Sequence, residues 1–290
     1  MAKKHLNEFQ LTALVNEALA IEAQAAYDAG AIGYMARALT QATIPHSKKE
    51  GTEFVRKNGN FTLTIIAPSS IGLPYGSIPR LLLSWISTEV VRTKESTLIM
   101  GENLSDFMRQ LDLTPTGGQW GSITRLRDQS RRLFSSTISY TYAGQSNSWQ
   151  DGGFRIANQS YLWWDEVKLD DAEDKRSRVV ITQEFYKELI ACPVPIDLRV
   201  LKFLMQSPMA LDIYCWLTYR MSYLKTPIVI PWGALQMQFG ADYKLTRQFK
   251  AAFLGHLKAV QVVYAQARFD VLEQGLKLYP SPTHIAKRLR

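Results

Sequence analysis

A basic stretch in the middle of the chain combines residue types that can bind nucleic acid. In GGQWGSITRLRDQSRRLFSST (residues 117–137), four arginines lie within eight positions. At about 100° per residue, the apolar side of a helix would carry Ile123, Leu126, Ser130, Leu133 and Phe134, and the opposite side Arg125, Asp128, Gln129, Arg132 and Ser136. An arginine fork pairs with guanine or phosphate, and a glutamine amide pairs with adenine. The stretch therefore fits either a solvated basic helix or a helix that reads DNA.

A second basic helix and a basic tail follow in the last third of the chain. In YKLTRQFKAAFLGHLKAV (243–260), the apolar side would carry Leu245, Phe249, Ala252, Phe253 and Val260, and the outward side Lys244, Arg247, Ala251 and Lys258. The tail ends in Lys287, Arg288 and Arg290, beyond the last predicted strand. We expect both sets of cations to contact phosphates.

The formal net charge of +8 is confined to the C-terminal third. Residues 1–192 carry 21 Lys+Arg and 21 Asp+Glu, whereas residues 193–290 carry 13 and 5. A domain with that imbalance attracts polyanions, nucleic acid first and anionic membrane second.

Residues that could support catalysis or hold a metal are scattered. The four histidines are His5, His46, His256 and His284, and none pairs with another at helical spacing. The chain lacks a GxxxxGK[ST] loop, an HExxH motif and a CxxC pair. The carboxylates of LDDAEDK (169–175) are expected to form a solvated loop. We expect no enzymatic activity, no cofactor and no metal site.

The hydropathy of the chain argues against a membrane location. No apolar run reaches the roughly 18 residues that a spanning helix needs, and MAKKHLNEF lacks the apolar core of a signal peptide. We therefore expect a cytoplasmic protein without a membrane partner.

The predicted elements repeat one order. The chain begins with one or two predicted helices over 8–42 and a strand over 61–67. Then follow an apolar helix (78–92), a strand (96–100), a helix (103–113), the first basic helix and a ribbon. The ribbon would comprise 136–142, 155–165 and 177–186, with a loop tip at 143–153. The order then recurs as an apolar helix (207–221), a strand (228–232), a short helix (233–240), the second basic helix and a hairpin (260–280).

Helix, strand, helix, helix and ribbon is the order of a winged helix-turn-helix, whose third helix enters the major groove while the wing contacts flanking DNA. We predict an α+β fold of tandem winged-helix domains preceded by a helical N-terminal segment. The segment would span 1–52, the first domain 53–192 and the second, basic domain 193–290. This arrangement favours DNA reading over a solvated helix for both basic stretches.

Aromatic residues alternate along the predicted ribbon. They are Tyr140, Tyr142, Trp149, Tyr161, Trp163 and Trp164, and their spacing fits sheet core better than base stacking. An edge of the ribbon could pair with a second copy, so we expect a homodimer that charge substitutions at Tyr161 or Trp163 would weaken.

Several long strings resemble the RepA family of bacterial plasmid replication initiators. They are GLPYGSIPRLLLSWISTEVVRT (72–93), PTGGQWGSITRLRDQSRRLFSSTIS (115–139), YDAGAIGYMARALTQATIPH (27–46) and SPMALDIYCWLTYRM (207–221). The resemblance implies a protein that binds repeated double-stranded sites in its replication origin, helps open the duplex and recruits the host initiator and helicase. Related initiators have two winged-helix domains and commonly dimerise through the first; the dimer represses its own gene and the monomer starts replication.

The predicted DNA contacts follow from both arguments, and the resemblance assigns the recognition role to Arg125, Gln129 and Arg132. The full set is Thr124, Arg125, Asp128, Gln129, Arg132, Ser136, Lys244, Arg247, Ala251, Lys258, Lys287, Arg288 and Arg290. A transcription repressor without initiator activity needs the same readout and remains open. Co-purification of a host helicase or initiator would discriminate the two, and a DNA-nicking enzyme is a distant third.

Overall fold

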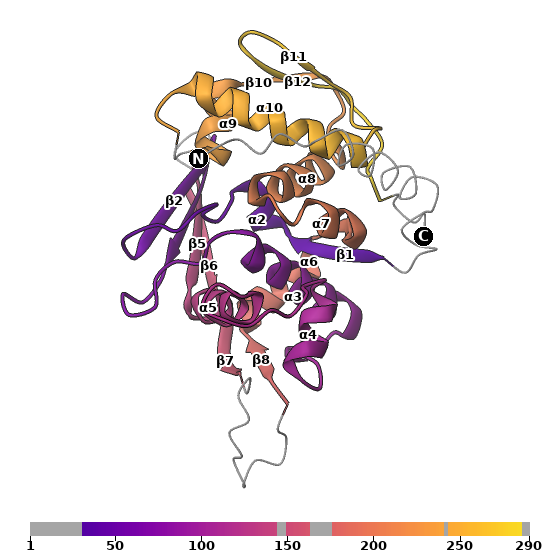
Figure 1. Cartoon of the computed structure of the whole chain (residues 1–290). Coiled ribbons are helices and arrows are strands. Elements are labelled where there is room, and N and C mark those ends of the chain that lie inside the picture. Colours follow the sequence, from indigo (N-terminus) through magenta and orange to yellow (C-terminus); the bar gives the residue numbers. More distant parts are fainter. Residues whose placement is uncertain (1–30, 144–148, 163–175, 241–242, 286–290) are drawn as a thin grey trace, which may run out of the picture.

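The computed structural model describes residues 31–143, 149–162, 176–240 and 243–285. Within these ranges the chain forms a mixed α+β fold with small antiparallel sheets, in agreement with the predicted class (Figure 1). A single apolar core runs through both halves of the chain, from Met35 to Leu278. The two predicted domains are therefore packed against each other.

The helices of the first half have the predicted order. They are α3 (Ser77–Thr93), α4 (Leu104–Gln110) and α5 (Ser122–Ser135), with β4 (Thr97–Ile99) between α3 and α4. Lys94 ends α3 in a left-handed conformation (φ 62°), and the Asn103 side chain starts α4 by accepting a hydrogen bond from the Asp106 backbone N–H. Because α3 contacts α5, α6 (Gln183–Ala191) and α8 (Pro208–Met221), it is the central helix of the fold.

The predicted ribbon is divided between two sheets. One has the order β2-β3-β5-β6, from β2 (Glu53–Asn58), β3 (Phe61–Ile66), β5 (Thr137–Ala143) and β6 (Trp149–Arg155). The other has the order β4-β8-β7, from β4, β7 (Ala157–Tyr161) and β8 (Arg178–Ile181). The split occurs at Ile156, which is fully buried between β6 and β7. Two predictions are wrong. Residues 149–153 belong to strand β6 and do not form the loop tip, and the ribbon segment predicted over 177–186 ends at Ile181, because α6 begins at Gln183.

The second half also has the predicted order. After β9 (Pro193–Asp197) and α7 (Leu198–Leu204) come α8, β10 (Ile228–Pro231), α9 (Trp232–Phe239), α10 (Thr246–Val263), β11 (Phe269–Val271) and β12 (Gly275–Leu278). The last strands form a sheet in the order β10-β12-β11. Helix α10 extends past residue 260, because Val260 and Val263 are both buried on its packing side. The β11–β12 hairpin, predicted over 260–280, therefore begins later than predicted.

The N-terminal segment contains a strand where a helix was predicted. β1 (Ile32–Ala36) pairs antiparallel with β9, and α2 (Arg37–Gln41) follows directly. Gly33 lies against Leu198 and Thr88 so closely that a Cβ would be 2.3 Å from Leu198 Cδ2. Pairing with β9 overrides the helical composition of this stretch. Residues 8–30 of the predicted helical segment lie outside the described residues.

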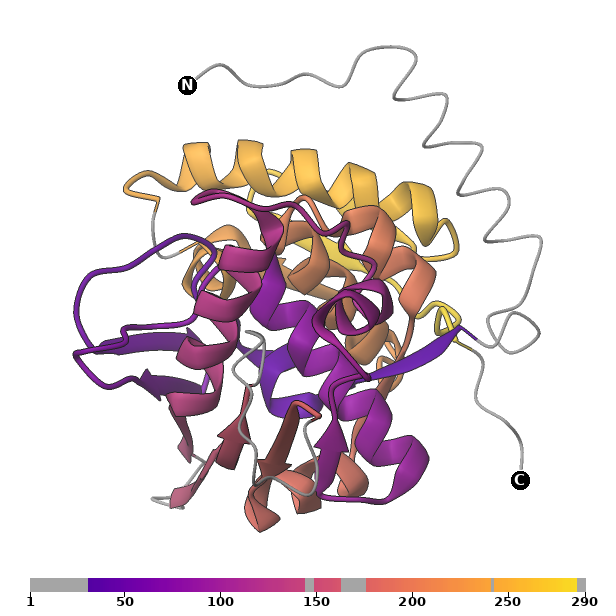
Figure 2. The same ribbon diagram turned by 60° about the horizontal axis from the view of Figure 1, so that its bottom comes forward.

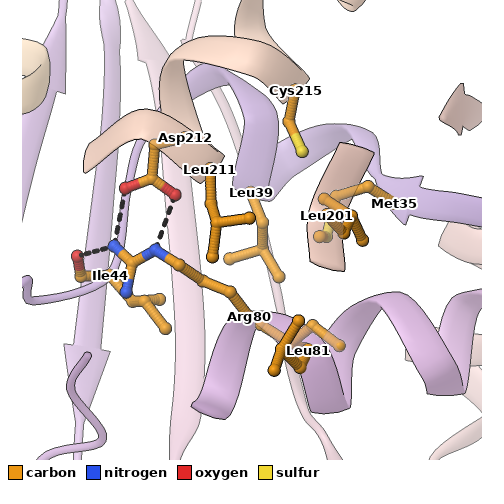
Figure 3. A pocket seen from close by; sticks show the side chains of 10 residues that line it. Met35, Leu39, Ile44, Arg80, Leu81, Leu201, Leu211, Asp212 and Cys215 are labelled. Atoms are coloured by element: carbon orange, nitrogen blue, oxygen red, sulfur yellow. Dashed lines mark hydrogen bonds and ion pairs between the residues drawn. The ribbon is translucent and has the colours of Figure 1, made fainter. Parts of the chain in front are cut away.

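A buried ion pair joins α3 of the first half to α8 of the second (Figure 3). Arg80 Nε donates to Asp212 Oδ1 (2.7 Å) and Arg80 Nη2 to Asp212 Oδ2 (2.6 Å). The remaining three guanidinium protons reach the carbonyls of Ile44 (2.8 Å), Pro45 (3.2 Å) and Gly76 (2.6 Å). His46 Nε2 lies 2.7 Å from Asp212 Oδ2. Every direction of the Arg80 fork is thus used, which makes this contact specific as well as charged.

Three histidines in the described part of the chain have pKa values below that of an exposed histidine. Burial lowers the pKa of His46, and the nearby Asp212 carboxylate only partly offsets this effect. Burial likewise lowers the pKa of His256 and His284. Tyr214 OH lies 2.8 Å from His284 Nδ1, and Ser207 Oγ lies 3.0 Å from His256 Nδ1. Neutral imidazoles therefore belong to the folded state.

We expect the free energy of unfolding to fall as pH is lowered from 7.5 to 5.5. An unfolded histidine titrates near pH 6.5, so below that pH the unfolded chain binds more protons than the folded one. Each histidine then contributes up to about 1.4 kcal/mol per pH unit, until the pH reaches its lowered native pKa. Urea unfolding at several pH values measures this slope. His284→Asn, which keeps an acceptor for Tyr214, should make it shallower, and equal stability at both pH values would contradict the prediction.

In the described part of the chain, no helix has the length and apolar character that crossing a bilayer requires. The same ranges hold no group of three or more His, Cys, Asp or Glu side chains arranged to bind a metal ion.

Candidate nucleic-acid interface

The inner side of α5 is as the periodicity predicts. Leu126, Ser130, Leu133 and Phe134 are buried, and Ile123 is half-buried against the core. The helix packs against α3 and β7. The sequence therefore identified the packing side of this basic helix correctly.

The polar side of α5 is only partly open to solvent. Thr124 and Arg125 are exposed, and the Asp128 side chain is 44% exposed. Gln129, however, is only 4% exposed, because its Oε1 accepts a hydrogen bond from the Tyr75 backbone N–H (2.8 Å). Ser136 is fully buried and donates to the Arg132 carbonyl. The expectation that Gln129 and Ser136 face outward is therefore wrong.

Arg132 is held between α5 and the loop that precedes α3. Its side chain is 15% exposed, its Nε donates to both Asp128 oxygens (2.8 and 2.9 Å), and its guanidinium lies over the Tyr75 ring. Gly72 leaves room for it, since a Cβ there would be 2.5 Å from Arg132 Nη1. The helical projection assumes that only one side of α5 packs against the rest of the protein, whereas the 72–75 loop covers a second side of this helix. Arg131, which the projection did not select, is exposed.

Gln129→Ala should affect the stability of the fold, whereas Arg125→Ala should affect DNA binding. Gln129→Ala removes the acceptor of the Tyr75 N–H and should lower the free energy of unfolding by about 1–3 kcal/mol. Arg125→Ala should leave stability unchanged and weaken specific DNA binding by about 1–3 kcal/mol if Arg125 pairs with a base edge. Urea unfolding and fluorescence anisotropy on matched duplexes measure the two effects. Equal loss on specific and random DNA would make Arg125 a phosphate contact.

The outward side of α10 matches its prediction at three of the four residues. Arg247, Ala251 and Lys258 are exposed on the helix, and so is Gly255. Lys244 is also exposed, but it precedes the N-cap Leu245 and so lies before the helix instead of on it. The opposite side is buried at Phe249, Phe253, Leu257, Val260 and Val263. Between the cations at the two ends, the exposed surface of the helix carries the small residues Ala251 and Gly255. Cations and a low surface between them suit the close approach of a DNA backbone.

Two other residues of this region differ from a simple projection. Leu245, predicted on the apolar side, is 46% exposed, because it is the N-cap with extended dihedrals and precedes the helix proper. Lys250 is turned inward: its Nζ lies 4.8 Å from the centre of the Trp232 ring and donates to the Leu272 carbonyl (3.3 Å). Lys250 thus fastens α10 to the β11–β12 hairpin.

The chain after β12 is anchored as far as Ile285. Tyr264 OH donates to the Pro282 carbonyl (2.6 Å), His284 packs on Tyr214 and Tyr264, and Ile285 is buried. The predicted phosphate contacts Lys287, Arg288 and Arg290 lie outside the described residues. Their starting point is nevertheless fixed on the second half.

The two basic helices run in different directions. In Figure 1 α10 lies across the top and α5 is seen nearly end-on, whereas Figure 2 shows both helices lengthwise, with α5 crossing the direction of α10. The two helices are therefore not parallel, so they would cross a long ligand in different directions.

The amino-acid sequence from 73 to 232 matches the family described as plasmid encoded RepA protein. The chain belongs to this family. The matched range includes α5 and ends at the first residue of α9, so α10 and its hairpin lie beyond it. The resemblance drawn from the sequence strings is thereby confirmed. No curated protein sequence matches the chain.

Two crystal structures share the fold of this RepA-family chain. Both contain domains 2 and 3 of RctB, and one is of selenomethionine derivatives. The first is 13% identical with a TM-score of 0.51, covering 83% of this chain and 94% of its own. The second is 12% identical with a TM-score of 0.53, covering 83% and 95%. At this identity the likeness establishes the fold alone: both halves together resemble a two-domain unit.

Proposed function

We propose that this RepA-family chain is a plasmid replication initiator that binds repeated double-stranded DNA sites at its replication origin through two winged-helix units. The observation that carries the proposal is the outward side of α10, the third helix of a helix-strand-helix-helix-hairpin unit. Arg247 and Lys258 are exposed on this helix, and Lys244 is exposed just before it. The third helix of such a unit enters the major groove. The excess positive charge of residues 193–290 supports the same reading.

The second half fits a winged helix more closely than the first. Its strand β10 pairs with β12 of the hairpin, so the strand between the helices and the wing form one sheet. In the first half β4 pairs with β8, and the β5–β6 ribbon instead joins β2 and β3. We therefore propose a modified winged helix for the first half, with Thr124, Arg125, Asp128 and Arg131 as its accessible polar residues.

The remaining parts of the proposal concern partners. We also propose that the chain helps open its origin, recruits a host initiator and helicase, and represses its own gene; its family membership supports these roles. Homodimerisation through the first half stays a prediction. Its expected contact Tyr161 lies on β7, at the edge of the β4-β8-β7 sheet, while Trp163 lies outside the described residues. We also propose a non-enzymatic role and a cytoplasmic location.

Footprinting of the full chain on DNA flanking its own gene tests the proposal. Several protected repeats together with co-purification of a host helicase or initiator are expected. One protected operator without such a partner would favour the repressor alternative. Nicks in supercoiled origin DNA incubated with Mg²⁺ would favour the enzyme instead.

Truncation after Ile285 should flatten the salt dependence of DNA binding. The truncation removes Lys287, Arg288 and Arg290 but keeps the anchored segment up to Ile285. Each lost phosphate contact lowers the slope of log affinity against log salt by about 0.9, so we expect a slope lower by up to about 2–3. Titrations between 50 and 200 mM salt measure it, and affinity should fall about equally on all sequences. An unchanged slope would confine the DNA contacts to the helices and the hairpin.

A further inference from the structure

Trp120, just before α5, is the most exposed large apolar side chain in the described part of the chain. It is 83% exposed, whereas tryptophan normally buries a large apolar area. All residues from 114 to 120 are exposed as well. Nothing in the described fold accounts for an indole held in solvent at this position.

The turn that carries Trp120 is rigid. Thr116 and Ser122 form three hydrogen bonds with each other: Thr116 N donates to Ser122 Oγ (2.9 Å), Thr116 Oγ1 to Ser122 Oγ (3.1 Å) and Ser122 N to Thr116 Oγ1 (2.8 Å). Gly118 has a φ of +84°, and a Cβ on Gly121 would lie 2.2 Å from the Thr116 carbonyl oxygen. The indole is thus presented from a fixed backbone, so binding through it would order few further residues.

The first backbone N–H groups of α5 already donate hydrogen bonds to acceptors within the chain. Ser122 N donates to Thr116 Oγ1, and Ile123 N donates to the Thr116 carbonyl (3.3 Å). These first amide groups would otherwise attract a phosphate. The feature that this turn offers to a ligand is therefore the face of the indole.

The stretch around Trp120 offers cations and no second exposed large apolar side chain. Arg125 and Arg131 are exposed on α5, the helix that follows Trp120, and no other exposed large hydrophobic residue belongs to 114–135. A protein partner would require a wider apolar patch. A nucleobase needs only one aromatic face beside cations that meet its phosphates.

We propose that Trp120 stacks on an unpaired base of DNA whose strands have separated. The inference rests on the proposed function and adds a ligand class to the α5 surface: an unpaired nucleobase, bound independently of its identity because every base has an aromatic face. In an intact duplex the bases are already stacked on one another and leave no face for the indole. The site therefore distinguishes opened from closed DNA.

The test compares two probes of one sequence with the full chain. One is an intact duplex that carries the footprinted site, and the other has about five unpaired nucleotides beside that site. Trp120→Ala should weaken binding to the opened probe roughly 5- to 150-fold, and binding to the duplex less than about twofold. Trp120→Phe should retain most of the affinity for the opened probe, since a phenyl ring also stacks. Quenching of tryptophan fluorescence by the opened probe should be smaller in Trp120→Phe.

The matched control is Tyr142→Ala, which removes another exposed aromatic side chain, on β5. It should leave binding to both probes unchanged. Equal loss on both probes upon Trp120→Ala, or loss on neither, would overturn the inference while leaving the proposed function intact. If the wild-type chain bound only the opened probe, through Trp120, the inference would stand and the proposed function would fail. Binding to neither probe would overturn both.

Discussion

Replacing Lys244, Arg247 and Lys258 together with glutamine should lower the affinity for duplex DNA by roughly 100- to 1000-fold at 0.1 M salt. Arg247 and Lys258 lie on the outward side of α10, and Lys244 lies just before its N-cap. All three side chains are exposed, so their replacement should remove charge without disturbing the packing of the fold. Each phosphate contact releases about 0.9 of a counterion, so three contacts account for about 2–3 logarithmic units between 0.1 and 1 M salt. Fluorescence anisotropy titrations measure the loss.

The control for this variant changes the same number of charges elsewhere. Lys48, Lys57 and Lys187 are exposed residues of the first half, outside both basic helices. Their replacement with glutamine should change affinity less than about fivefold, because only long-range attraction is weakened. Equal losses in the two triple variants would mean that total charge, and not the α10 surface, binds DNA. That result would remove the main support for the proposed function.

Asp212→Ala should lower the free energy of unfolding by about 3–5 kcal/mol. Removing one partner leaves the Arg80 guanidinium buried without its counter-charge. Burial alone would raise the pKa of Asp212, but the charge of Arg80 and hydrogen bonds from His46 and Arg80 outweigh it, so the pKa lies below its usual value. The carboxylate is thus ionised throughout the neutral range. Urea unfolding at pH 7.5 measures the loss.

Two further variants show whether the charge itself is responsible. Asp270→Ala removes an exposed carboxylate that accepts a hydrogen bond from Tyr279 OH, and should cost no more than about 0.5 kcal/mol. Arg80→Met combined with Asp212→Leu should recover much of the stability, because Met35, Leu39 and Leu201 line the same pocket (Figure 3). A loss below about 1 kcal/mol in Asp212→Ala alone would show that the junction does not depend on this pair.

Sequence patterns predicted the second half well because its signals are local. The 3.6-residue period of α10 identifies both its buried phenylalanines and its exposed cations, and the helix-strand-helix-helix-hairpin order follows from successive turns and apolar runs. The same period gave the packing side of α5. Family membership could also be recognised in advance, since the strings around α3 and α5 lie mainly inside the matched range.

The errors arise where distant segments meet. Gln129 and Arg132 were expected in solvent, but the loop at 72–75, more than fifty residues earlier in the chain, covers them. Residues 32–36 were expected to be helical, but they pair with β9, about 160 residues later. Neither contact can be recognised from the spacing of apolar and polar residues in the segment concerned. In both places a contact with a distant segment determines the structure, against the local sequence pattern.

The β1–β9 strand pair and the Arg80–Asp212 contact hold the two halves in a fixed position relative to each other, which a flexible linker would not do. Two DNA-binding surfaces on a flexible tether sample many separations, with an effective concentration set by tether length. In the proposed initiator, α5 and α10 instead hold one separation and one rotation about the duplex axis. Both can be seated at other spacings only if the DNA bends or twists, at a free-energy cost that depends on its own sequence. Base pairs that no side chain touches would then contribute to recognition.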